Sequence, residues 1–348
     1  MDLQIFWFLL IAILWAGYFV LEGFDFGVGM LLPFVGRNAR DRGTMLETIG
    51  PVWDGNEVWL VVAAGATFAA FPAWYATMFS GFYLALLLVL VLLIARVVSF
   101  EWRGKSESPH WRALWSGANA VASFGAPFLW GVALATLLNG VPLDSDGDFA
   151  GSFWDLFSLY SVFAGLATVL LFTFHGATFL TLRTTGHLRE RASRAARLLS
   201  VVAAVVGAAF LIATVAVAVD RNDKDVFPPI LPAVLGIAAL VLAVGFVLRG
   251  RNGRAFAMTA LGILLTVATL FTSLYPRVLV SAPDFGNSLT VSSASSSHYA
   301  LGVMTVVALI LTPVVLLYQG WTYYVFRGRL GGEEIASPVE LVSEQTGT

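Results

Sequence analysis

The feature that most constrains this chain is a series of long apolar runs that recur along almost its whole length. A membrane-spanning helix needs about 20 mostly apolar residues. We count nine such runs, which cover residues 5–35, 52–70, 76–98, 116–139, 153–181, 196–219, 227–249, 255–276 and 298–326. Of the 348 residues, 58% are apolar and only 12% are charged, about half the charged fraction of a soluble domain. The sequence therefore predicts an all-α polytopic membrane protein with nine transmembrane helices.

The basic residues lie almost entirely on alternate connections between these runs. One set of connections, with the helix ends beside them, holds 17 of the 20 Lys and Arg residues: Arg37, Arg40, Arg42, Arg96, Arg103, Lys105, Arg112, Arg183, Arg189, Arg191, Arg194, Arg197, Arg249, Arg251, Arg254, Arg327 and Arg329. The other set holds Arg221, Lys224 and Arg277. Because Lys and Arg concentrate in cytoplasmic loops, this split predicts an N-terminus outside and a C-terminus inside.

The spacing of the runs predicts one transmembrane domain over residues 1–330, followed by a polar cytoplasmic tail at 331–348. Within the domain we expect two four-helix bundles, at about 1–140 and 150–276, plus one peripheral helix at about 298–326. Paired spans joined by basic inner connections occur in both halves, which is the basis of this division.

Two acidic residues stand inside the first apolar run, in the stretch VLEGFDFGVGM. Glu22 and Asp25 are three residues apart, so they share one face of a helix. Gly23, Gly27 and Gly29 flank them, and small residues let another helix backbone come close in a membrane. We therefore expect this face to pack against protein and not against lipid.

A second acidic pair, Asp54 and Glu57, opens the second run in the stretch IGPVWDGNEVWL. The predicted topology brings this pair, Asp25 and Arg96 to one depth in the inner half of the membrane. Acids near a helix N-terminus are favoured by the helix dipole, by ~0.3–1 kcal/mol, and Arg96 could simply neutralise one of them. Charges within a bilayer are nevertheless costly and usually mark ion or proton paths. We predict that this cluster takes up protons from the inside.

One histidine, His175 in TFHGATFL, lies deep in an apolar run. It could be an axial ligand of a haem, but a b-type haem in a helix bundle usually takes two axial ligands. A core histidine hydrogen-bonded beside Thr178 and Thr181 is the other interpretation. An optical spectrum of the chain alone would distinguish the two.

The acidic connection GVPLDSDGDFAG carries Asp144, Asp146 and Asp148. A calcium loop of the EF-hand type would want a glycine at its sixth position, where this chain has Phe149, so a solvated acidic turn is expected. The chain has no cysteine, which excludes disulfides, thiolate metal sites and cysteine nucleophiles. It also shows no metal-ligand spacing, no phosphate-binding loop and no feature of nucleic-acid binding.

Six stretches resemble, in order and over nearly the whole chain, subunit II of the cytochrome bd quinol oxidases. They are GFDFGVGML (23–31), GPVWDGNEVWL (50–60), FPAWYATMFSGFYLAL (71–86), ARVVSFEWRGK (95–105), GVPL (140–143) and LGVMTVVALILTPVVLLYQGWTYYVF (301–326). The resemblance implies nine spans in two four-helix bundles plus a peripheral helix.

The resemblance also implies a role in the aerobic respiratory chain. Cytochrome bd oxidises quinol and reduces O₂ to water in a prokaryotic plasma membrane. In that family, subunit I holds the quinol site, two b-type haems and one d-type haem, while subunit II binds no haem and has no complete active site. The expected partners are subunit I, small single-helix accessory subunits and lipids, with quinol bound through the complex.

Four residues match positions that the family associates with a proton path to haem d. Asp54, preceded by Trp53, matches the aspartate of the Trp-Asp-Gly-Asn motif. Asp25 matches the Gly-Phe-Asp aspartate, and Arg96 matches the arginine that closes the third span.

Two further residues of the second run differ in how they relate to the family. Trp59 matches a position near a proposed lateral access for oxygen, while Glu57 is a departure, because some relatives have glutamine there. The connection at 220–227 is short, whereas some relatives carry a long insertion.

A different class of function stays open at this point, namely a secondary transporter built from repeated helix bundles, although transporters tend to have broken helices at mid-membrane.

Overall fold

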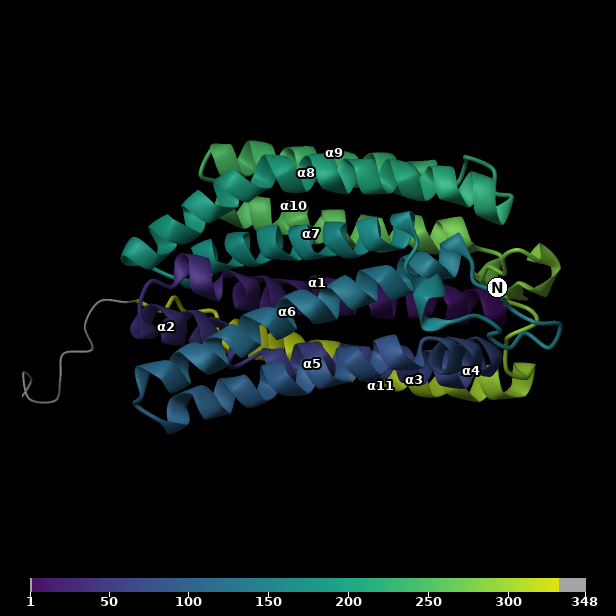
Figure 1. Ribbon diagram of the computed structural model, residues 1–348, viewed down its shortest axis with the longest axis horizontal. Coiled ribbons are helices and arrows are strands. Elements are labelled where there is room, and N and C mark those ends of the chain that lie inside the picture. Colours follow the sequence, from purple (N-terminus) through teal and green to yellow (C-terminus); the bar gives the residue numbers. More distant parts are fainter. Residues whose placement is uncertain (1, 332–348) are drawn as a thin grey trace, which may run out of the picture.

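The computed structural model describes residues 2–331, which form a long bundle of α-helices (Figure 1). The α-helices are α1 (Leu3–Val35), α2 (Ala39–Ile49), α3 (Trp53–Ala70), α4 (Pro72–Gly81), α5 (Tyr83–Trp102), α6 (Pro109–Asn139), α7 (Leu159–Arg183), α8 (Gly186–Asn222), α9 (Ile230–Leu248), α10 (Asn252–Leu274) and α11 (His298–Val325). Short 3₁₀ turns η1 (Arg103–Lys105), η2 (Phe153–Leu156) and η3 (Phe285–Asn287) and a small antiparallel pair, β1 (Arg277–Leu279) and β2 (Leu289–Thr290), complete the described chain.

Eight of these helices are long and apolar enough to cross a membrane: α1, α5 with η1, α6, α7, α8, α9, α10 and α11. The expected ninth span, α3, has 18 residues and carries Asp54, Asn56 and Glu57 in its first two turns, which lower its hydropathy. The structure therefore confirms a polytopic helical protein, while the count of nine, the two bundles and the orientation in the membrane stay predictions. The tail at 332–348 lies outside the described residues.

Two expected elements differ in detail. The predicted third span at 76–98 is divided at Phe82, so that α4 and α5 replace one helix. The first basic connection is not a simple loop, because Asn38 caps the helix α2 by accepting the backbone N–H of Asp41 at 2.7 Å. Apolar periodicity gave no signal for either feature.

Helix α1 runs through the middle of the bundle (Figure 1). It packs against α3 and α6 on one side and against α7 and α10 on the other. At the crossing with α7 two glycines face each other, and a Cβ atom on Gly27 would lie 2.8 Å from the Cα of Gly176. The expected close approach of another backbone at the glycines of α1 is therefore confirmed.

The peripheral helix α11 is attached mainly at its two ends. Near its start, the indole N–H of Trp7 approaches the carbonyl of Leu301 at 3.2 Å and the hydroxyl of Thr305 at 3.0 Å. Just beyond its end, Leu330 donates its N–H to the carbonyl of Arg183 at 2.8 Å and accepts the N–H of Thr185 at 3.1 Å. Leu301 is the one residue of α11 that is fully buried.

The glycine crossing gives a first testable prediction. Gly27→Ala should destabilise the detergent-solubilised protein by about 1–3 kcal/mol, because overpacking a well-packed contact costs that much. Gly117→Ala on α6 is the matched control, since no atom outside its own turn lies within 4 Å of the added Cβ. Thermal unfolding should show a lower midpoint for Gly27→Ala alone; equal midpoints would contradict a tight α1–α7 contact.

Candidate functional site: a buried charge cluster on α1

The centre of the site is an ion pair between Glu22 on α1 and Arg96 on α5. Both side chains are completely buried, and a nitrogen of the Arg96 guanidinium donates directly to a carboxylate oxygen of Glu22. The guanidinium also lies over the rings of Phe26 and Phe100, at 4.6 and 5.4 Å from their centroids. Arg96 is thus held by one carboxylate and two aromatic faces, which favour a cation.

The acids of α3 divide between the cluster and the surface. A carboxylate oxygen of Glu57 lies 3.8 Å from the same Arg96 nitrogen, and its side chain is 20% exposed. Asp54, one turn earlier, is exposed at the beginning of the helix. The structure therefore brings Asp25, Glu57 and Arg96 together, as expected, but leaves Asp54 outside the buried group. Trp53 is half-buried, with its ring 5.4 Å from that of Phe100, the residue beneath Arg96.

Asp25 is also fully buried, and its partner is an amide. The side-chain amide of Asn56 donates to Oδ2 of Asp25 at 2.7 Å. The carbonyl oxygen of the same side chain accepts from the hydroxyl of Tyr323 at 2.7 Å and from the amide of Gln319 at 3.3 Å. Gln319 in turn accepts the indole N–H of Trp59 at 2.7 Å.

This chain of hydrogen bonds has a fixed direction. An indole N–H can only donate, so the oxygen of Gln319 must accept from Trp59 and its nitrogen must face Asn56. The oxygen of Asn56 then accepts, and its nitrogen faces Asp25. The hydrogen bonds that α11 makes therefore determine that Oδ2 of Asp25 is an acceptor.

Several buried polar atoms of the cluster have no hydrogen-bond partner among the described residues. They are the hydroxyl of Tyr18, Oε2 of Glu22, Oδ1 of Asp25, Oε2 of Glu57, and Nε and one terminal nitrogen of Arg96. Buried polar groups are nearly always satisfied by protein or by ordered water, and internal waters typically bind to such groups. These atoms are the groups of the cluster to which an ordered water would bind.

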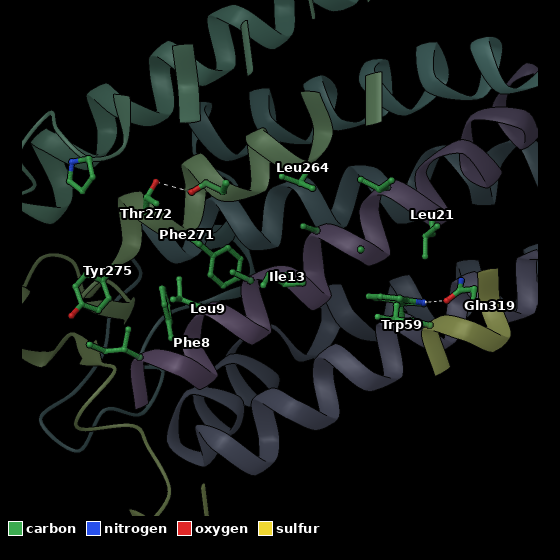
Figure 2. A pocket seen from close by; sticks show the side chains of 18 of the residues that line it. Phe8, Leu9, Ile13, Leu21, Trp59, Leu264, Phe271, Thr272, Tyr275 and Gln319 are labelled. Atoms are coloured by element: carbon green, nitrogen blue, oxygen red, sulfur yellow. Dashed lines mark hydrogen bonds between the residues drawn. The ribbon is translucent and has the colours of Figure 1, made fainter. Parts of the chain in front are cut away.

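An apolar groove of about 940 Å³ lies beside the cluster, between α1, α10 and α11 (Figure 2). Trp59, hydrogen-bonded to Gln319, lies at one end of the groove, and Tyr275 lies at the other. Phe8, Phe271 and Leu264 are among the side chains that line the space between them. Trp59 is therefore placed where an apolar molecule in the groove would meet the polar network.

His175 has hydrogen-bond partners on both ring nitrogens. Its Nδ1 lies 2.7 Å from the hydroxyl of Thr259 and its Nε2 lies 3.2 Å from the carbonyl of Val20. The ring also stacks on Phe256 at a centroid distance of 4.5 Å. This is the arrangement of a core histidine, although Thr259 binds the ring in place of the expected Thr178 and Thr181. Neither nitrogen is directed at an open position, so the residue does not fit a haem ligand.

The acidic connection after α6 is a solvated turn, as expected. Asp144, Asp146 and Asp148 are exposed. Oδ1 of Asp144 accepts the backbone N–H groups of Asp146 at 3.0 Å and of Asp148 at 2.9 Å. Its carboxylate therefore stabilises the turn itself.

The sequence indicates Glu22 as an acid on the face of Asp25, but its pairing with Arg96 joins residues 74 positions apart and leaves no local signal. The polar partners Asn56, Gln319 and Tyr323 were not predicted. Asn56 lies inside the Trp-Asp-Gly-Asn stretch, so its position was visible although its role was not. Tyr323 lies in a helix with no other sign of contact to the acids.

A comparison with known families decides what kind of protein carries this site. Residues 3–326 match the family described as cytochrome bd terminal oxidase subunit II. The chain belongs to this family. That membership, which covers nearly all described residues, decides against the transporter alternative.

Individual members of the oxidase family agree with this assignment. The chain is 42% identical over 333 residues to the cytochrome bd ubiquinol oxidase subunit 2 of Bacillus subtilis, covering 94% of this chain and 97% of that protein. It is 36% identical over 365 residues to the cytochrome bd-I ubiquinol oxidase subunit 2 of Escherichia coli K12, covering 96% of each. A chain from the structure of the bd oxidase of Geobacillus thermodenitrificans has the same fold, with a TM-score of 0.74 at 17% identity, covering 93% of this chain and 97% of that one.

The buried ion pair leads to a second prediction. Arg96→Gln leaves Glu22 as a buried carboxylate without a cation, so the variant should lose about 3–5 kcal/mol of stability. Arg221→Ala, which removes an exposed pair with Asp220 (3.1 Å), should cost about 0–1 kcal/mol. Unfolding of the two variants can be compared by thermal or denaturant midpoints.

The double variant Glu22→Gln/Arg96→Gln serves as the internal control. It removes both charges, so it should be more stable than Arg96→Gln alone. If the single and double variants unfold together, the pair does not determine the stability of the site.

Proposed function

We propose that this chain is the haem-free subunit II of a cytochrome bd-type quinol:O₂ oxidoreductase, in which it stabilises subunit I and supplies a proton path from the cytoplasmic side. Its family membership supports the role as an oxidase subunit. The observation that supports the path is the buried group of Glu22, Asp25 and Arg96, joined to the surface through Glu57 and Asp54. Ionisable groups inside a membrane helix bundle usually mark such paths.

From the positions of these side chains we infer a sequence of steps for the path. Asp54 is exposed at the start of α3, where it can take a proton from water. Glu57 is one turn further along the same face and partly exposed, and it contacts Arg96. Arg96 connects Glu57 to Glu22, and Asp25 lies one turn from Glu22 on α1. Water bound to the unpartnered atoms would carry the proton between these side chains.

Arg96 stabilises the negative charge of the carboxylates in the path. Its guanidinium stays protonated under all relevant conditions, so it does not itself transfer the proton. It offsets the negative charge of the neighbouring carboxylates while a proton moves among them. Trp53 and Phe100 shield this region on the side of α3 and α5.

The electron-transfer groups belong, in this proposal, to the partner. Both ring nitrogens of His175 are engaged by other groups of this chain. In the proposal, two b-type haems, one d-type haem and the quinol site are held by subunit I. The large apolar surfaces of α3, α5 and α11 offer contact area for subunit I, small accessory subunits and lipids in the plasma membrane.

Trp59 and the apolar groove suggest how oxygen would reach the complex. Oxygen is apolar and concentrates in the bilayer, and the groove lined by Phe8, Leu264 and Phe271 offers it an apolar environment. Trp59 lies at the end of the groove that is nearest Asn56. We assign Trp59 to this access route and not to chemistry.

The proton path is tested by neutral replacement of its acids. In the assembled oxidase, Asp54→Asn and Asp25→Asn should each slow oxygen consumption at least about tenfold, equivalent to ~1.4 kcal/mol on the barrier. The haem spectrum should be unchanged, because the haems lie in the partner. Asp144→Asn in the exposed outer turn is the control and should leave the rate unaltered. Full rates in both path variants would remove the path while leaving the family assignment intact.

The location of the haems is tested separately. His175→Gln keeps a hydrogen-bonding side chain at this position, so the haem-to-protein ratio and the optical spectrum of the purified heterodimer should not change. A missing haem band in an intact heterodimer would assign a haem to this chain.

A further inference from the structure

The two buried carboxylates of α1 stand in unequal surroundings. The guanidinium of Arg96 donates to Oε1 of Glu22, and both side chains are fully buried. Asp25 has no ion pair within the described part of the chain, and its one side-chain partner is the neutral amide of Asn56. A pair of acids whose environments differ in this way takes on different protonation states.

Formal charges point in the same direction. If Glu22, Asp25 and Arg96 were all ionised, the buried group would carry two negative charges and one positive charge. Glu57 adds another negative charge at 3.8 Å from Arg96. An unpaired charge that is buried away from bulk solvent is so unfavourable that the group usually takes up a proton instead. Two carboxylates that share one site likewise do not both ionise.

The other groups that face the cluster do not supply a second cation. Tyr18, one turn before Glu22 on α1, and Tyr323 on α11 are neutral phenols near pH 7. His175 on α7 is engaged by Val20 and Thr259. Asp54 on α3 is an acid and adds to the negative side.

We propose that Asp25 is the proton-holding residue of the cluster, neutral in the resting protein, and that Glu22 is the permanent counter-ion of Arg96. The proton lies on Oδ1 of Asp25, which has no partner, because the directed chain from Trp59 through Gln319 and Asn56 keeps Oδ2 as an acceptor. Glu22 is thus a positioning residue, since it occupies Arg96 and so prevents Arg96 from drawing the proton off Asp25.

The function of this arrangement rests on the proposed proton path, whereas the protonation states do not. Within the path, a neutral Asp25 stores one proton at the buried end, away from the exposed Asp54. It can release its proton when the neighbouring water or the partner subunit accepts one, and it is then reloaded through Glu57. Asp25 carries a negative charge only between these two events.

Isotope-edited infrared spectroscopy of the intact heterodimer tests the assignment without turnover. Aspartate labelled with ¹³C at the side-chain carboxyl shifts the C=O stretching band of protonated aspartic acids, so the labelled-minus-unlabelled spectrum at pH 7 shows those groups. The wild type should show a band that is absent in Asp25→Asn. The same band should be lost in Glu22→Gln, because Asp25 then ionises to pair with Arg96.

Two variants serve as matched controls. Glu57→Gln removes a nearby charge that is not the main partner of Arg96, and Glu22→Asp keeps the counter-ion; both should retain the band. Haem content and elution volume identify the variants that have assembled, and Glu22→Asp with Asp25→Asn still decides the matter if Glu22→Gln does not assemble.

The outcomes separate the two proposals. A band unchanged in Asp25→Asn would show that Asp25 is ionised and would overturn the inference. A band that persists in Glu22→Gln would overturn the role of Glu22. If the band behaves as expected while both Asp25→Asn and Asp54→Asn consume oxygen at the full rate, the protonation states hold and the proton path fails.

Discussion

The structure depends on one buried ion pair. Glu22 and Arg96 lie on helices α1 and α5, and neither side chain reaches solvent. Separating them would leave two uncompensated charges, so the pair fixes the relative positions of α1 and α5 along the bundle. Asp25, Asn56 and Glu57 take their places around it. The central position of α1 follows from the same constraint, because its polar face must be enclosed on all sides.

The sequence predicted those parts of the molecule that local physics determines. The length of the apolar runs predicted a helical membrane protein. The glycines near Asp25 predicted a close helix contact, which Gly27 and Gly176 make. The three-residue spacing of Glu22 and Asp25 gave a shared helix face. The Trp-Asp-Gly-Asn stretch and its neighbours gave the family, which the match over residues 3–326 confirms.

The rest could not be read from the sequence, because it depends on contacts between distant segments. Helix α5 packs on α6, which packs on α1, and only this arrangement decides that Arg96 pairs with Glu22 and not with Asp54. The partner of His175 was expected nearby in sequence, at Thr178 or Thr181, but lies on α10 at Thr259. One expected span is divided into α4, which ends at Gly81, and α5, which begins at Tyr83. A single glycine inside an apolar run is common in membrane helices and did not by itself predict the break.

The manner in which α11 is attached has a mechanical consequence. Trp7 holds its first turns, and the backbone pairing of Leu330 with Arg183 and Thr185 holds the segment behind its last turn. Between these anchors only Gln319 and Tyr323 reach the polar interior, through Asn56. A displacement of α11 between these two attachments, such as a change in bilayer thickness could impose, would therefore reach Asp25 through the side-chain amide of Asn56.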